Sequence, residues 1–165
     1  MPETPETDPA RIVADADVLV ADLLAGDSDE SGNAAREAMD AIRSHSWLEL
    51  VASDRLLDEA EAVIADLADP DLAGAWRERI EALRVRVDHP AGDHPALASA
   101  YRGQAAHVLS YDEQLRDAGA SAALGSRLNV SVKTPEGFVA LFDAESLYEA
   151  VVGDEYPGPD RDPRA

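Results

Sequence analysis

Residues 11–24, Arg-Ile-Val-Ala-Asp-Ala-Asp-Val-Leu-Val-Ala-Asp-Leu-Leu, begin as a short apolar stretch that ends in an acid and continue with helical periodicity. We predict a strand over Arg11–Asp15 and a helix over Val18–Leu24. The same succession of strand and helix returns along the chain, and further strands are predicted over Leu48–Ser53, Val85–Val87, Ala106–Tyr111 and Leu128–Val132. Elements that alternate in this way form parallel sheets through right-handed crossovers. We therefore expect an α/β fold, a three-layer α-β-α sandwich around a mostly parallel twisted sheet of about four to five strands.

The helices between these strands are bounded by capping residues and prolines. Ser53 is a good N-cap for the second long helix, and Thr134 followed by proline opens the last one. The predicted helices cover 33–44, 54 to about 67, 70–83, 93 or 94 to about 103, 112–118, and 135 to about 151. The apolar residues of the helix from 54 to 67 share one side, which we expect to be buried: Leu56, Leu57, Ala60, Val63, Ile64 and Leu67.

A chain of 165 residues suits one domain with a single core. No long linker and no internal repeat interrupts it. We place the domain at residues 11–152 and expect disordered tails at 1–10 and 153–165, because both ends are acidic and rich in proline.

The charge balance is extreme, with 34 acidic against 14 basic residues and a net charge of −20. Apolar periodicity persists through most of the chain, which argues against disorder and for adaptation to molar salt, where screening acts within ~3 Å. At ordinary ionic strength this charge would argue against a nucleic-acid ligand. In molar salt that argument weakens, so net charge neither supports nor excludes RNA.

Cysteine is absent from the sequence, which excludes disulfides, thiolate nucleophiles and zinc–thiolate sites. No apolar run approaches the ~18 residues that a membrane span needs, and the start lacks the basic and apolar regions of a signal peptide. We expect a cytoplasmic protein with no membrane partner.

Acids at strand ends are the candidates for chemistry, because ligands of open parallel sheets bind beyond the carboxyl ends of the strands. Asp15 and Asp112 each follow a predicted strand directly. Asp93 begins a helix that starts at the same edge, and Glu59 lies in the second turn of a helix that follows another strand. Carboxylates gathered in this way repel unless a cation neutralises them, and oxygen ligands suit Mg²⁺ or Mn²⁺. Metal-assisted hydrolysis of a phosphodiester is the chemistry that such a site favours.

Four segments resemble, in order, the motifs of PIN-domain ribonucleases, here in a form typical of halophilic archaea. Arg-Ile-Val-Ala-Asp15-Ala-Asp17 is similar to the first motif, an apolar strand, an Asp, and Asn, Ser or Asp two residues later. Glu59 on its amphipathic helix resembles the second motif, and Asp93-His-Pro-Ala-Leu the third. Ala-His-Val-Leu-Ser-Tyr-Asp112 resembles the fourth, and the resemblance spans about residues 11–142.

The resemblance implies a metal-dependent endoribonuclease with RNA as substrate and Mg²⁺ or Mn²⁺ as cofactor. Asp15, Glu59, Asp93 and Asp112 are then the metal-holding and catalytic acids. Family members are often toxins controlled by an antitoxin protein and sometimes RNA-processing factors. Family members are often dimers, which makes a homodimer one possible oligomeric state of this chain, and the sequence itself does not decide between a homodimer and a monomer.

Several alternatives remain at this point. The stretch from Asp93 to Asp112 is one residue longer than the family pattern, so His94 competes with Asp93, and Glu61 competes with Glu59. A PIN-like module that binds RNA or protein without catalysis is one alternative function. A haloacid-dehalogenase-like phosphatase is another, because Asp15-Ala-Asp17 resembles its nucleophile motif, although Lys133, the only lysine, follows the acids that it should precede.

Overall fold

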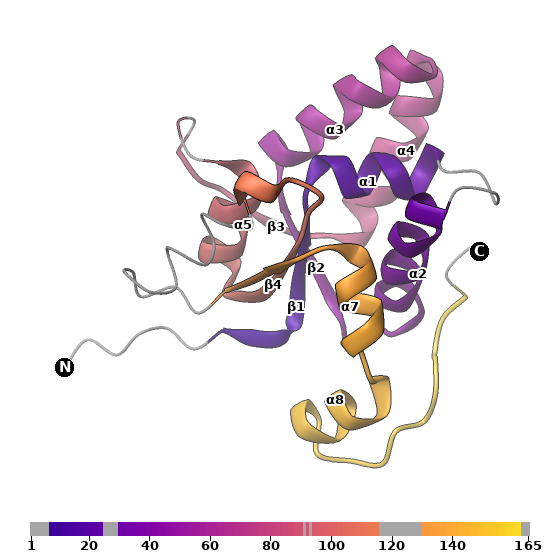
Figure 1. The fold of residues 1–165 in the computed structure, drawn as a ribbon, viewed down its shortest axis with the longest axis vertical. Coiled ribbons are helices and arrows are strands. Elements are labelled where there is room, and N and C mark those ends of the chain that lie inside the picture. The colour runs from indigo at the N-terminus through magenta and orange to yellow at the C-terminus, as the bar shows by residue number, and fades with distance from the viewer. Residues whose placement is uncertain (1–6, 25–29, 91, 93, 116–129, 163–165) are drawn as a thin grey trace.

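Figure 1 shows a computed structural model of the chain, which describes residues 7–24, 30–90, 92, 94–115 and 130–162. Its centre is one five-stranded sheet with the order β3-β2-β1-β4-β5, and every neighbouring pair is parallel. The strands are β1 (Asp8–Ala14), β2 (Glu49–Ser53), β3 (Val85–Val87), β4 (Ala105–Leu109) and β5 (Ser131–Lys133).

Helices cover both faces of this sheet. α5 packs against β1, β2 and β4, whereas α1, α2 and α7 form a connected layer (Figure 1). The helices are α1 (Ala16–Leu24), α2 (Glu30–Ser44), α3 (Asp54–Leu67), α4 (Pro70–Leu83), α5 (Pro95–Gly103), α7 (Pro135–Leu141) and α8 (Ala144–Val151). The predicted α/β class and its parallel sheet are confirmed. None of the helices in the described parts of the chain is long and apolar enough to cross a membrane.

β1 is the central strand because its apolar run is buried on both faces, as parallel sheets require. Ile12 and Val13 are completely buried, and Ile12 lies in register with Leu50 of β2 and His107 of β4. The strand begins at Asp8, inside the segment that we expected to be a disordered tail. There, the backbone N–H of Asp8 donates to the carbonyl of Gln104 at 2.7 Å. Residues 1–6 lie outside the described part.

The predicted caps determine where the helices begin. Ser53 Oγ accepts from Leu56 N at 3.1 Å at the start of α3, and Thr134 Oγ1 accepts from Gly137 N at 3.1 Å at the start of α7. α3 and α4 have the predicted bounds. The buried side of α3 is shorter than predicted, however: Val63 is 38% exposed and Leu67 is 68% exposed. The second half of α3 extends past the sheet beside α4 (Figure 1), so its apolar residues have less of the sheet to pack against.

The last helix is also different from the prediction, because the chain forms α7 and α8 where we expected one helix from 135 to about 151. Phe142 leaves the helical conformation with ψ 124°, and Asp143 acts as the N-cap of α8. Both carboxylate oxygens of Asp143 bond to Ser146, one to its backbone N at 3.3 Å and one to its hydroxyl at 3.0 Å. A local capping interaction therefore outweighs the continuous apolar periodicity.

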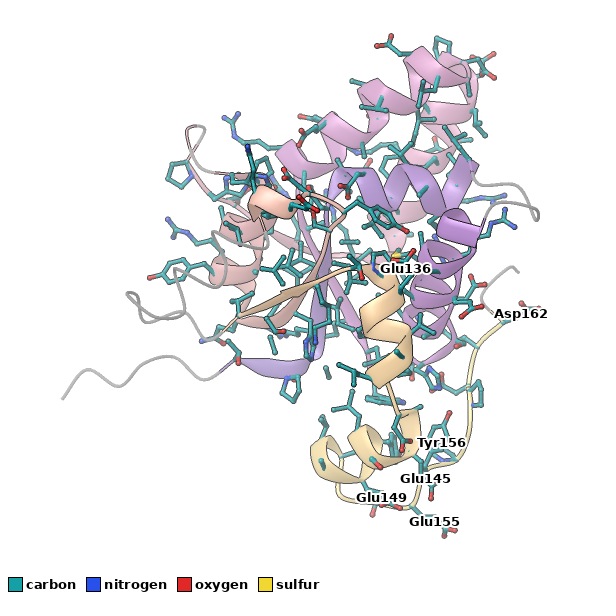
Figure 2. The ribbon with its side chains drawn as sticks, in the orientation of Figure 1. Glu136, Glu145, Glu149, Glu155, Tyr156 and Asp162 are labelled. Carbon is teal, nitrogen blue, oxygen red and sulfur yellow. The ribbon has the colours of Figure 1, made fainter. Side chains whose placement is uncertain are left out.

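Residues 153–162 follow α8 as an extended segment, which we call the C-terminal strap, where we had expected a disordered tail. The strap runs back along α2 and carries the labelled Tyr156 and Asp162 (Figure 2). His45 Nε2 and the Tyr156 hydroxyl are 2.7 Å apart, and the N–H groups of Asp160 and Arg161 donate to Ser44 O at 2.9 and 3.2 Å. These bonds satisfy the carboxyl end of α2, which a disordered tail would leave to water.

A buried ion pair joins α1 to α2. Asp22 is only 1% exposed, and its two carboxylate oxygens accept from both terminal nitrogens of Arg43. Asp40 is a second acidic neighbour of the same guanidinium, at 3.4 Å. Burial lowers the pKa of Arg43, but Asp22 and Asp40 together raise it by more, so Arg43 stays charged.

Candidate functional site

The strand order places one topological switch point at the carboxyl ends of β1 and β4. From β1 the chain moves to β2 on one side, and from β4 it moves to β5 on the other, so the connections diverge. Such a point is where open parallel sheets bind their ligands. Two backbone bonds hold the chain just beyond these strands: Asp15 N donates to Leu109 O, and Ser110 N donates to Lys133 O, both at 2.9 Å.

Asp15 occupies the buried end of β1 and is 6% exposed. Its Oδ1 accepts from Ala16 N at 2.8 Å, and its Oδ2 accepts from the Ser110 hydroxyl at 2.9 Å. A buried carboxylate needs such donors to offset its lost hydration. Asp15 is therefore fixed in position by one bond from its own helix start and one from the neighbouring strand end.

Asp17 lies beside it, in the first turn of α1. Its Oδ2 accepts from Tyr111 N at 3.1 Å, whereas its buried Oδ1 has no hydrogen-bond partner among the residues that the structure describes. Burial, followed by the negative charge of Asp15, raises the pKa of Asp17 from 3.8 to about 6. The charge of Asp112 raises it further, against the lowering effect of the backbone N–H donors.

Asp112 follows β4 and is exposed. Its backbone N–H donates to the Ser110 hydroxyl at 3.0 Å, and its Oδ1 accepts from Gln114 N at 2.9 Å, which caps a helical turn at 113–115. Ser110 thus connects the two predicted acids, because its hydroxyl donates to Asp15 and accepts from Asp112. The rest of the predicted helix 112–118 lies outside the described residues.

The other two predicted acids do not join this group in the described structure. Glu59 lies on the exposed side of α3, and no interaction of the described residues connects it to Asp15. Asp93 lies outside the described residues. The two alternatives are engaged elsewhere: His94 Nδ1 accepts from Ala96 N at 3.2 Å as the N-cap of α5, and Glu61 binds Arg77 at 3.0 Å.

Two members of the site were missed or left undecided from the sequence. Asp17 was named only as part of the motifs around Asp15, and its tertiary position is what shows the buried oxygen without a partner among the described residues. Ser110 carried a signal, because it stands two residues before Asp112 at the end of an apolar strand. We name the three acids Asp15, Asp17 and Asp112 the aspartate cluster.

The aspartate cluster offers the type of ligand that a divalent cation binds, but it does not bring three such ligands together. Carboxylate oxygens are the ligands that Mg²⁺ and Mn²⁺ prefer, and a cation would offset the repulsion that raises the pKa of Asp17. The unpartnered Oδ1 of Asp17 is free to coordinate one. Within the described ranges, no three His, Asp or Glu side chains are arranged closely enough to hold a metal ion together.

Fold and site together define a parallel α/β protein with an aspartate cluster at its topological switch point. Comparison with known families gives a more particular assignment: the "Family of unknown function (DUF7384)" matches residues 6–164, and the chain belongs to this family. No curated protein and no solved structure matches the chain.

Proposed function

We propose that the protein is a metal-dependent ribonuclease that hydrolyses RNA phosphodiester bonds at the aspartate cluster. The observation that supports it most is the convergence of Asp15, Asp17 and Asp112 on the switch point, with one buried carboxylate oxygen left unpartnered. A structural role alone does not account for this convergence, because an unpartnered buried carboxylate costs stability. The resemblance of this edge to PIN domains favours RNA as the substrate.

In this proposal Asp15 and Asp17 hold Mg²⁺ or Mn²⁺, and Asp112 would have to turn towards them to complete a site of three carboxylates, because the described structure does not bring the three close enough to hold an ion together. When bound, the cation supplies activation of water and stabilisation of charge on the phosphoryl oxygens. Ser110 holds Asp15 in one orientation through its hydroxyl. Without a cation, burial and the charge of Asp15 raise the pKa of Asp17 to about 6, and a bound cation would favour the ionised form of Asp17.

Glu59 and Asp93 remain proposed ligands in a more complete site. Glu59 would have to turn towards the cluster from α3, and Asp93 would approach from the segment before α5. The RNA backbone would lie across the carboxyl ends of β1 and β4. An antitoxin protein and a second copy of the chain are further proposed partners, both carried over from the resemblance.

A second candidate function is a PIN-like binding module without catalysis. The exposed position of Glu59, together with the absence of a three-ligand group among the described residues, favours this alternative. Both functions place RNA at the same edge of the sheet, and they differ in whether a divalent cation is needed for a chemical change.

Cleavage of end-labelled RNA in molar KCl with Mn²⁺ separates the two functions. We expect the wild type to cut RNA and EDTA to stop the cleavage. Asp15→Asn should reduce the cleavage rate more than ~100-fold, which exceeds the 10–100-fold loss typical of a residue that only hydrogen-bonds to a metal ligand. Asp66→Asn is the matched control, because Asp66 is an exposed acid on α3 and the change in charge is the same. Folded wild type that binds RNA without cutting it would support the binding module. Equal cutting by wild type and Asp15→Asn would refute the nuclease proposal.

A further inference from the structure

A pocket of about 350 Å³ lies between the helix pair α7–α8 and the strands β4 and β5, and we name it the α7–α8 pocket. Its volume falls in the range of small-molecule sites. It is separate from the aspartate cluster, and none of the cluster residues lines it. The lining residues used below are His107, Lys133, Phe138, Leu141, Phe142 and Leu147.

Lys133 is the only lysine in a chain with 34 acidic residues, and its side chain lines this pocket. It is partly buried, and burial lowers its pKa. Across the described ranges no carboxylate lies within ion-pair distance of its ammonium group, although the arginines of α2 and α4 form several such pairs. A partly desolvated cation without a counter-ion is costly, and an anionic ligand would remove that cost.

His107 on β4 lies beside Lys133. Because His107 is in register with Ser131, two residues before Lys133, both side chains stand on the same face of the sheet. The Nδ1 atom of His107 is buried and has no hydrogen-bond partner in the described structure. Burial, followed by the charge of Lys133, lowers the pKa of His107 to about 4, so the ring is neutral at pH 7. Lys133 is therefore the one cationic group of this pair at pH 7.

The remaining walls are apolar. Phe138 and Phe142 stack with their ring centroids 5.1 Å apart, and Leu147 packs on the core from α8. Leu141 at the rim is 79% exposed and extends the apolar wall to the surface. Such walls would bury a hydrocarbon group.

The acids near the pocket do not occupy its cationic end. Asp143 also lines the pocket, but both of its oxygens are used in capping α8. Figure 2 shows Glu145 beside Tyr156, Glu149 at the outer side of α8 and Glu155 on the C-terminal strap. Their repulsion of an anion is weak in molar salt, because exposed charges are screened within ~3 Å, whereas a partly buried contact is screened much less.

We propose that the α7–α8 pocket binds a small amphipathic carboxylate, with its carboxylate at Lys133 Nζ beside the neutral ring of His107 and its hydrocarbon part against Phe138, Phe142 and Leu141. This site goes beyond the proposed nuclease and does not depend on it. Lys133 supplies the charge that selects an anion, the uncharged ring of His107 forms part of the wall beside it, and the phenylalanine pair selects an apolar tail.

The test compares hexanoate with hexan-1-ol, which has the same tail and no charge, on the folded full chain in molar KCl. Selective ¹³C-lysine labelling gives one side-chain signal to follow, because Lys133 is the sole lysine. We expect hexanoate to shift this signal saturably and the alcohol to bind about ten-fold more weakly, the size of one charge-assisted hydrogen bond. Calorimetry gives the affinity of variants that lack the lysine.

Three variants make the test specific. Lys133→Met is expected to lose the preference for hexanoate over the alcohol, whereas Lys133→Arg keeps the positive charge and the preference. Ala150→Trp places a bulky group in the pocket from an exposed lining position and is expected to block both ligands. Absence of saturable binding to folded wild type would overturn the proposal. So would equal affinity for the two ligands, or an unchanged preference in Lys133→Met.

Discussion

Replacing Asp17 by Asn is predicted to stabilise the cation-free protein while removing its function. Asp17 is ionised at pH 7 although burial and the charge of Asp15 oppose ionisation and raise its pKa to about 6. Asparagine is nearly isosteric and removes the charge. Its amide oxygen can still accept the bond from Tyr111 N. The substitution therefore relieves desolvation and repulsion at the cost of a ligand group.

The size of the effect follows from the pKa. The difference between the ordinary value of 3.8 and about 6 corresponds to at most ~3 kcal/mol of unfavourable free energy in the ionised folded state. Because Asp17 keeps part of its surface in solvent, we halve this figure and expect a gain of roughly 1–2 kcal/mol. Burial is the largest cause and is not a salt effect, so most of the gain should persist in molar KCl.

The assay is urea unfolding of wild type and Asp17→Asn between pH 4 and pH 8, with EDTA present. The folded pKa of Asp17 lies above the unfolded one, so its contribution favours folding below about pH 4 and is lost as the pH rises through 6. The variant should therefore match the wild type near pH 4 and exceed its stability above pH 6. Equal stability at every pH, or a less stable variant at pH 7, would refute the reasoning about this buried acid.

Substitutions at three further positions test other interactions of the fold and site. Asp22→Asn leaves Arg43 without its buried partner and should lower the free energy of unfolding in urea by ~3–5 kcal/mol. Asp17→Asn, on the same helix, should raise it. Ser110→Ala removes the donor to Asp15 and should cost ~1–3 kcal/mol, while Ser110→Thr keeps the hydroxyl and should cost less; equal losses would contradict this role. The folded pKa of His107 lies below the unfolded 6.5, so its contribution is present above pH 6.5 and is lost as the pH falls towards 4. As the pH falls from 6.5 towards 4, the melting temperature of His107→Gln should therefore rise relative to that of the wild type. A difference in melting temperature that stays constant with pH would argue against a buried neutral ring.

The elements of the fold were predictable because each carries a local signal. Short apolar strands, Ser53 and Thr134 as caps, and proline at helix starts are readable without any tertiary information. The split between α7 and α8 depends on Asp143 binding Ser146, a local competition that the apolar periodicity conceals. The position of the C-terminal strap depends on contacts more than a hundred residues apart in sequence, such as His45 with Tyr156.

The site was predictable in part for the same reason. Asp15 follows β1 directly and Asp112 lies three residues after the end of β4, so parallel topology brings both to one edge. The orientation of Glu59 depends on the rotation of α3 about its axis, which its packing against the sheet decides. The raised pKa of Asp17 depends on its burial and on the charge of Asp15, and the burial is not visible in the spacing of residues along the chain.

Binding of Mn²⁺ to the cluster tests the central claim most directly. Free Mn²⁺ can be titrated by electron paramagnetic resonance in molar KCl, with wild type, Asp15→Asn and the exposed-acid control Asp66→Asn. The account predicts saturable binding by wild type and Asp66→Asn, and its loss in Asp15→Asn. Bound Mn²⁺ should also raise the free energy of unfolding, by ~2.7 kcal/mol at a hundred times the Kd. No saturable binding to folded wild type, or equal binding by Asp15→Asn, would contradict the account.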